Sequence, residues 1–184
     1  MIDKQQCEEK IRWVAAALHE PVEFRRRAQT VANDLGPNAI ETLAQLFHSE
    51  HTPPAELADE FPRLGEWIAA RQFAIFEMFY HFREAALTVL RRVAFGAYDW
   101  TQGNAIEILC RLAAEGIDRG RTLADLKLEI PAMQDTALLY AAGPLLHQAS
   151  QSQELAAIIE ELQQVSEFKE AVAELQSLNE SKAS

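Results

Sequence analysis

Residues 38–47 read Asn-Ala-Ile-Glu-Thr-Leu-Ala-Gln-Leu-Phe, and residues 104–113 read Asn-Ala-Ile-Glu-Ile-Leu-Cys-Arg-Leu-Ala. Six of the ten positions are identical, and each block begins within two residues of a glycine. The blocks are 66 residues apart, twice a period of about 33, and such periods are typical of solenoids built from helix pairs. Two amphipathic helices can share leucine spacing by chance, so the common Asn-Ala-Ile-Glu start is the specific part of the match.

Outside these blocks the chain also has the pattern of an all-helical protein. Apolar residues recur at helical spacing along nearly its whole length, and strict strand-type alternation is rare. Pro21 suits the first position of a helix that ends at Gly36-Pro37. Further helices are expected over about 64–82, 84–95, 102–115, 153–164 and 167–178, with a helix pair broken at Gly143-Pro144 between 131 and 149. The sequence predicts one all-α domain over 1–178 and a frayed tail at 179–184.

The stretch from Pro21 to Phe47 carries a second signal. It contains Arg-Arg-Arg-Ala, then Leu35-Gly36, then Ala39-Ile40 followed by leucines three residues apart. This resembles the short bacterial type of HEAT-like repeat, in which one helix carries Arg-x-x-Ala and ends in Leu-Gly, and a second opens with Ala-Ile. A second copy extends from about Arg83 to Leu112. The resemblance implies stacked antiparallel helix pairs in a short α-solenoid; a globular multi-helix bundle is the alternative.

Composition excludes several classes of protein. The chain has 184 residues, of which 48% are hydrophobic and 24% charged, with a net charge of −11. This apolar share indicates a folded protein, and the negative charge disfavours nucleic acids and anionic membrane surfaces as partners. Cys7 and Cys110 are too few for a disulfide framework or a zinc cluster. The polar N-terminal segment lacks a signal-peptide pattern, and no apolar run matches the thickness of a bilayer. A cytoplasmic location is therefore expected.

Motifs for catalysis and metal binding are nearly absent from the sequence. His48 and His51 can share a helix face, but Pro53-Pro54 follows at once and further ligands are missing. Phosphate loops, nucleophile elbows and Cys-x-x-Cys pairs do not occur. The cluster at 25–27, Arg-Arg-Arg, is best interpreted as structural, with one member pairing with acids of a neighbouring repeat. We expect no catalytic residue, no metal and no cofactor.

Aromatic residues gather in one part of the chain. Ten of the fifteen lie between residues 61 and 100, namely Phe61, Trp67, Phe73, Phe76, Phe79, Tyr80, Phe82, Phe95, Tyr98 and Trp100. The simplest interpretation of this aromatic band is the core of the central repeat. A second interpretation makes Tyr98 and Trp100, in a connector, anchors for a partner. A third is a pocket for a flat ligand.

The favoured function is that of a non-enzymatic protein-binding scaffold or adaptor. The C-terminal third has no Lys or Arg between Lys127 and Lys169. One interpretation is a solvated helix face that caps the solenoid; the other is a docking surface for a basic partner, which includes the case of an acidic inhibitor or immunity-type protein. Candidate partner-binding positions lie on the second helices of the two repeats and in the connector at 98–101, directly before the later of these helices: Glu41, Gln45, His48, Tyr98, Trp100, Glu107, Arg111 and Glu115.

Two alternatives stay open. Short bacterial HEAT repeats resembling these occur in bilin lyases, which implies a chromophore or other flat apolar ligand in the aromatic band. The aromatic helix at 64–82 is also a candidate surface for a homo-oligomer, because its apolar residues leave little room for a polar face.

Overall fold

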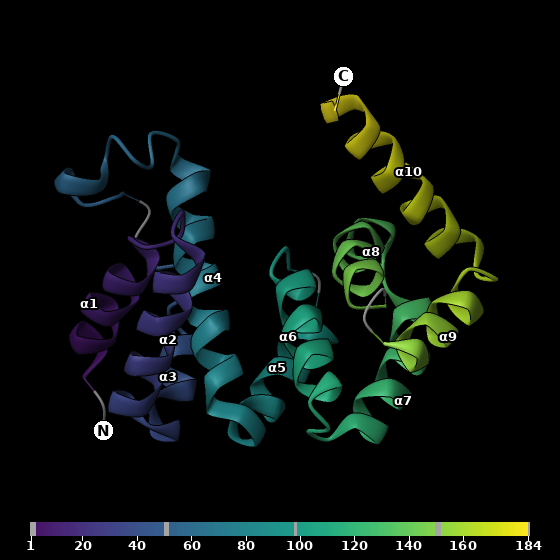
Figure 1. Ribbon diagram of the computed structural model, residues 1–184, viewed down its shortest axis with the longest axis horizontal. Coiled ribbons are helices and arrows are strands. Elements are labelled where there is room, and N and C mark those ends of the chain that lie inside the picture. The colour runs from purple at the N-terminus through teal and green to yellow at the C-terminus, as the bar shows by residue number, and fades with distance from the viewer. Residues whose placement is uncertain (1–2, 50–51, 98, 150–151, 184) are drawn as a thin grey trace. The chain divides into compact units, whose positions relative to one another are not determined.

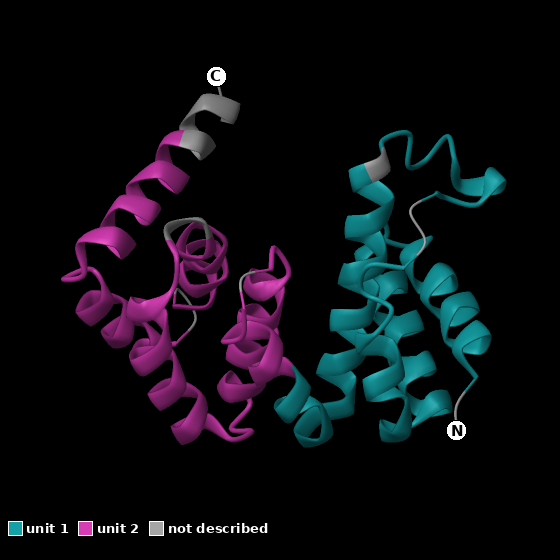
Figure 2. Ribbon diagram, turned by 180° about the vertical axis from the view of Figure 1, so that it is seen from behind, with its two compact units in different colours: residues 1–89 teal, residues 90–184 magenta. Residues whose placement is uncertain are grey.

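The computed structural model describes residues 3–49, 52–97, 99–149 and 152–183, and every regular element in these ranges is a helix (Figure 1). The all-α prediction is confirmed. The chain divides into two compact units, residues 1–89 and 90–184, with the boundary inside helix α5 (Leu87–Ala94) (Figure 2). Each unit has an apolar core of its own. The sequence-based prediction of a single domain over 1–178 is not tested by this division into two units and stays a prediction.

Unit 1 is organised around its longest helix. Its elements are α1 (Lys4–Ala15), α2 (Pro21–Leu35), η1 (Pro37–Ala39), α3 (Ile40–Ala44), η2 (Ala55–Leu57), α4 (Leu64–Phe82) and η3 (Arg83–Ala86). Helix α4 packs against α1, α2 and α3 (Figure 1). Pro21 begins α2, where its missing N–H has no partner to lose, and Gly36 ends it with a φ of 67°. The predicted start of this helix at Pro21 and its predicted end at Gly36 are therefore both confirmed.

The aromatic band of α4 forms the core of unit 1. Phe76 stacks on Phe47 with ring centroids 4.9 Å apart, and Phe79 meets both rings edge-on. Trp67, Phe76, Phe79 and Phe82 are buried within the unit, so the core interpretation is confirmed for them. An oligomer through residues 64–82 stays a prediction, and Phe73, 42% exposed, is a large apolar residue of α4 that lies at the surface.

Unit 2 is organised around α8. Its elements after α5 are α6 (Gln102–Ala114), α7 (Arg119–Glu129), η4 (Ile130–Ala132), α8 (Asp135–Ala149), α9 (Gln153–Leu162) and α10 (Ser166–Ala183). Helix α8 packs against α6, α9 and α10. The contact with α6 is close because Gly103 has no side chain: a Cβ there would lie 2.4 Å from the backbone oxygen of Tyr140.

The structure corrects one predicted break and extends one helix. The expected helix pair interrupted at Gly143-Pro144 is a single helix, α8, with Pro144 inside it. Proline removes one helical hydrogen bond, but the buried residues Leu138, Ala141 and Leu145 hold both sides of the helix in the core. Helix α10 continues to Ala183 and so includes most of the expected tail, of which Ser184 lies outside the described residues.

The two repeated blocks bury equivalent positions, one block in each unit. Four residues of each are at most 5% exposed, namely Ala39, Ile40, Leu43 and Leu46 in the first and Ala105, Ile106, Leu109 and Leu112 in the second. The first block spans η1, α3 and the turn after it, whereas the second lies within α6. The repeat therefore predicts burial correctly, and the HEAT-like stacking stays a prediction.

A bilayer-crossing helix is absent from the described ranges, because no helix there combines sufficient length with sufficient hydropathy.

Candidate functional site

The positions selected from the sequence are divided between the two units. Glu41, Gln45 and His48 lie in unit 1, on α3 and the turn after it, and are exposed. In unit 2, Glu107 and Arg111 on α6 are half-buried, and Glu115, directly after α6, is exposed. Trp100 is 40% exposed in the connector before α6, and Tyr98 lies outside the described residues.

A groove of about 450 Å³ in unit 1 brings together three segments that are distant in the sequence. The turn after α1 contributes Leu18 and His19, the turn after η2 contributes residues 59–62, and the first turns of α4 contribute Glu66 and Ala69. We call this the acidic groove. Sequence reasoning missed it because no single segment contains it.

The floor of the acidic groove is a layer of rings. Phe61 is 2% exposed, and its ring lies 5.5 Å from the imidazole of His19 in a stacked arrangement. Behind it, the fully buried indole of Trp67 lies 5.3 Å away. The backbone N–H of Phe61 donates to Leu57 O at 3.0 Å, which attaches this residue to η2. The floor is therefore positioned by both tertiary packing and local hydrogen bonding.

The rim of the acidic groove carries three exposed carboxylates, Asp59, Glu60 and Glu66. Glu66 accepts a hydrogen bond from the backbone N–H of Arg63, whose guanidinium lies 3.7 Å away. Asp59 and Glu60 have no cationic partner among the described residues. An apolar floor with free carboxylates at the rim is suited to a ligand that is both apolar and cationic. The signal available in the sequence is Asp59-Glu60 directly before Phe61-Pro62.

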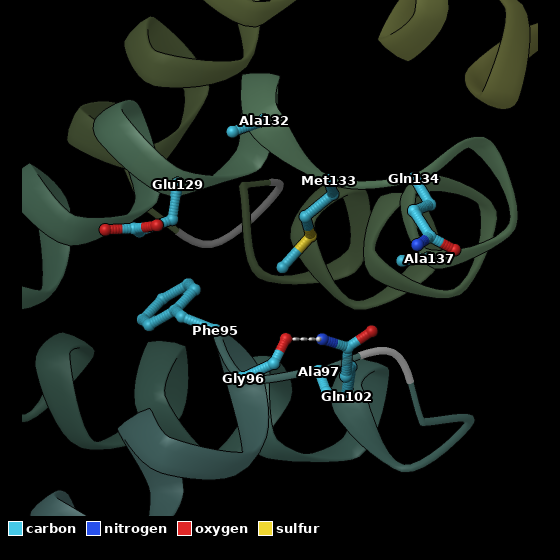
Figure 3. Close-up of a pocket in the computed structure, with 9 residues that line it drawn as sticks. All are labelled: Phe95, Gly96, Ala97, Gln102, Glu129, Ala132, Met133, Gln134 and Ala137. Atoms are coloured by element: carbon cyan, nitrogen blue, oxygen red, sulfur yellow. Dashed lines mark hydrogen bonds between the residues drawn. The ribbon is translucent and has the colours of Figure 1, made fainter.

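A second, smaller cavity of about 190 Å³ lies inside unit 2 (Figure 3). One wall comprises Phe95, Gly96 and Ala97, which follow α5, together with Gln102 at the start of α6. The other wall comprises Glu129, Ala132, Met133, Gln134 and Ala137 from the end of α7 to the start of α8. We call this the unit 2 cavity. Of the predicted aromatic band, Phe95 is the member that lines this cavity among the residues that the structure describes.

Gln102 gives the unit 2 cavity an unusual polar group. Its side chain is 98% buried, and its Nε2 donates to Ala94 O at 3.3 Å and to Gly96 O at 3.2 Å. Carbonyl oxygens only accept, so the amide orientation is determined and Oε1 faces away from them (Figure 3). Among the described residues Oε1 has no hydrogen-bond donor, and a buried unsatisfied acceptor costs about 1–3 kcal/mol.

In the described parts of the chain, no three His, Cys, Asp or Glu side chains form a group that could hold a metal ion. His48 is described, and His51 is outside the described residues.

Comparison with known proteins does not identify a family for this chain. No protein-family model, no curated protein and no solved structure matches the chain.

Proposed function

We propose that the chain is a non-enzymatic binding protein whose acidic groove takes a basic, partly apolar segment of another protein. The observation that carries the proposal is the juxtaposition of the Phe61–His19 floor with the unpaired carboxylates of Asp59 and Glu60. Apolar residues of the partner would cover the ring layer, and Lys or Arg side chains would reach the rim. The groove accommodates a few residues of a peptide rather than a broad protein surface.

The charge of the whole chain supports the same kind of partner. A net charge of −11 attracts cationic proteins over a distance and increases their rate of association at low salt. It does not by itself select a binding position. The acidic groove, with its apolar floor and acidic rim, determines where the partner binds. The negative charge of the whole chain increases the rate at which a cationic partner reaches it.

The first experiment is a calorimetric titration of the full chain with short blocked peptides. Acetyl-Arg-Leu-Arg-Leu-Lys-amide is expected to bind with an affinity that falls as salt rises, because exposed charges are screened. Acetyl-Arg-Ser-Arg-Ser-Lys-amide keeps the charge but lacks the apolar part, so it should bind more weakly. Acetyl-Glu-Leu-Glu-Leu-Glu-amide should not bind.

Matched variants locate the binding. The double variant Asp59→Asn with Glu60→Gln removes two rim charges and should weaken the basic peptide about tenfold at low salt. The control Glu56→Gln with Glu84→Gln removes two exposed charges of unit 1 outside the groove and should change the affinity little. Ala69→Phe, which places a ring in the groove, should abolish binding while the thermal unfolding temperature stays near that of the parent.

Two results would contradict this function. Equal weakening by both charge-neutralising pairs would mean that the peptide responds to net charge alone. Absence of binding by the Leu-containing basic peptide, together with uptake of a bilin and a change in its absorption spectrum, would replace the proposal with the chromophore alternative.

A further inference from the structure

We infer that His19 makes binding in the acidic groove sensitive to pH, so that a basic partner is bound above about pH 7 and released as the pH falls toward about 5.5. The inference rests on the proposed function and concerns the regulation of the same site. Its starting point is geometric. The exposed imidazole of His19 lies within the groove, stacked on the buried ring of Phe61 at 5.5 Å. It has no hydrogen-bond or ion-pair partner among the described residues, so solvent protons reach it freely.

The charged groups around His19 come from three segments of unit 1. They are the carboxylates of Glu20 in its own turn, of Asp59 and Glu60 after η2, and of Glu66 on α4, with Arg63 paired to Glu66. Carboxylic acids ordinarily titrate near about pH 4, and guanidinium groups keep their charge, whereas an imidazole ordinarily gains its proton between about pH 8 and 5. Among the groove-lining residues that the structure describes, His19 is therefore the one whose charge changes in this interval.

The charge of the imidazole determines how readily an apolar segment can cover it. Covering a neutral ring with a leucine side chain costs little, whereas an imidazolium loses hydration when it is covered. A protonated His19 would also repel the Lys or Arg side chains that reach for Asp59 and Glu60. Both effects have the same sign, because each disfavours the complex when His19 carries a proton. The affinity for a basic partner should therefore fall as the pH falls.

The test is a calorimetric titration of the full chain at pH 8 and at pH 5.5, at low salt. Acetyl-Arg-Leu-Arg-Leu-Lys-amide has no group that titrates in this interval, so a change in its affinity reports on the protein. The parent chain should bind it about tenfold more weakly at pH 5.5 than at pH 8.

Variants at position 19 should fix the affinity at either end of this range. His19→Phe keeps a ring on Phe61 but cannot take up a proton, and should bind with similar affinity at both pH values. His19→Arg is a planar, permanent cation and should bind weakly at both. The control is His48→Gln, at an exposed histidine of unit 1 outside the groove, which should keep the pH dependence of the parent. Because His19 is exposed in a turn, all three variants should unfold near the temperature of the parent.

A second readout follows from thermodynamic linkage. If a proton on His19 weakens binding, then binding must release protons through the same coupling. Titrations at pH 6.5 in phosphate and in ACES, two buffers with different enthalpies of ionisation, measure the number of protons released. The parent should release a fraction of a proton per peptide bound, and His19→Phe should release close to none.

The outcomes separate this inference from the proposed function. Failure of the basic peptide to bind at pH 8 would overturn both. Binding at pH 8 with an equal or higher affinity at pH 5.5 would overturn the inference alone. A decline toward pH 5.5 that His19→Phe retains in full would also overturn it, because the titrating group would then lie elsewhere in the chain.

Discussion

The guanidinium of Arg71 lies 2.5 Å from the carboxylate of Glu8, across a sequence separation of 63 residues. Arg71 is 1% exposed on α4, and Glu8, on α1, also accepts a hydrogen bond from the hydroxyl of Ser49. The guanidinium is a second donor to that hydroxyl, at 3.2 Å. This polar cluster joins three segments of unit 1, in which Gln72 and Glu77 of α4 are also buried.

Removing one member of the buried pair should destabilise unit 1 strongly. Arg71→Met leaves the Glu8 carboxylate without its cation, and breaking a buried ion pair from one side costs about 3–5 kcal/mol. The double variant Arg71→Met with Glu8→Gln should recover part of the loss, because no unpaired charge remains. Urea unfolding followed by circular dichroism measures both. If the double variant is no more stable than Arg71→Met, the coupling between the two charges is absent.

Gly103 should not tolerate even one added carbon. A Cβ there would meet the backbone oxygen of Tyr140 at 2.4 Å, and backbone cannot move aside as a side-chain end can. Gly103→Ala should therefore separate α6 from α8 and cost about 1–3 kcal/mol. Gly120→Ala, in α7 with open space around it, is the control and should be neutral or slightly stabilising. Similar thermal stabilities for the two variants would argue against the close approach.

Arg91 should be sensitive to a change in geometry at constant charge. Its guanidinium lies 2.6 Å from Asp125 and 2.9 Å from Asp118, and it donates to the Thr122 hydroxyl at 3.2 Å. Arg91→Lys keeps the charge but cannot reach several acceptors at once, and should cost about 1–2 kcal/mol in urea unfolding. The control is Arg121→Lys, an exposed residue 3.9 Å from the same Asp125, for which little change is expected. Equal effects would mean that the multiple contacts of Arg91 contribute nothing.

Both thiols should be inert in the folded protein. Burial is the main cause that raises the pKa of Cys110 to about 12, and the pKa of Cys7 is raised chiefly by burial as well. At pH 8 Ellman's reagent should react slowly with the native chain and release two equivalents after unfolding. Since the unfolded Cys110 thiol ionises near its ordinary value of 9.0, stability should fall as the pH rises above 9. Cys110→Ala should reduce that alkaline decline, and fast labelling of the native chain would contradict its burial.

Glu23 should titrate well below an ordinary glutamate. Hydrogen bonds from Arg26 and Arg27 lower the pKa of its carboxyl from 4.5 to about 2. These arginines thus pair within their own helix, α2, rather than with acids of a neighbouring repeat as the sequence suggested. The stabilising contribution is present above pH 4.5 and is lost as the pH falls toward 2.

A carbon NMR titration of the Glu23 carboxyl measures this shift directly. Arg26→Gln with Arg27→Gln should move the midpoint back toward 4.5, whereas Arg25→Gln, an exposed neighbour, should not. An ordinary midpoint in the parent chain would show that the two hydrogen bonds are not formed in solution.

Local patterns predicted the helices of this protein well. The expected helix at 64–82 coincides with α4, and Pro21 and Gly36 delimit α2 as helix punctuation predicts. The exception is Pro144, where the usual rule for proline is overridden by buried contacts on both sides. The candidate sites were harder to predict: helix positions and two aromatic residues of a connector were selected, whereas the groove and the cavity are built largely from turns and helix ends.

By itself the sequence determined the all-α class, several helix boundaries and the buried positions of the two repeated blocks, because a period of 3.6 residues and terminal signals act within a few turns of the chain. Only the tertiary structure decided which apolar faces meet. That choice depends on packing between distant segments, so it alone placed Arg71 against Glu8 and His19 on Phe61. It also buried the amide oxygen of Gln102 without a hydrogen-bond donor among the described residues. Helical periodicity carries no information about these contacts, and the acidic groove arises from them.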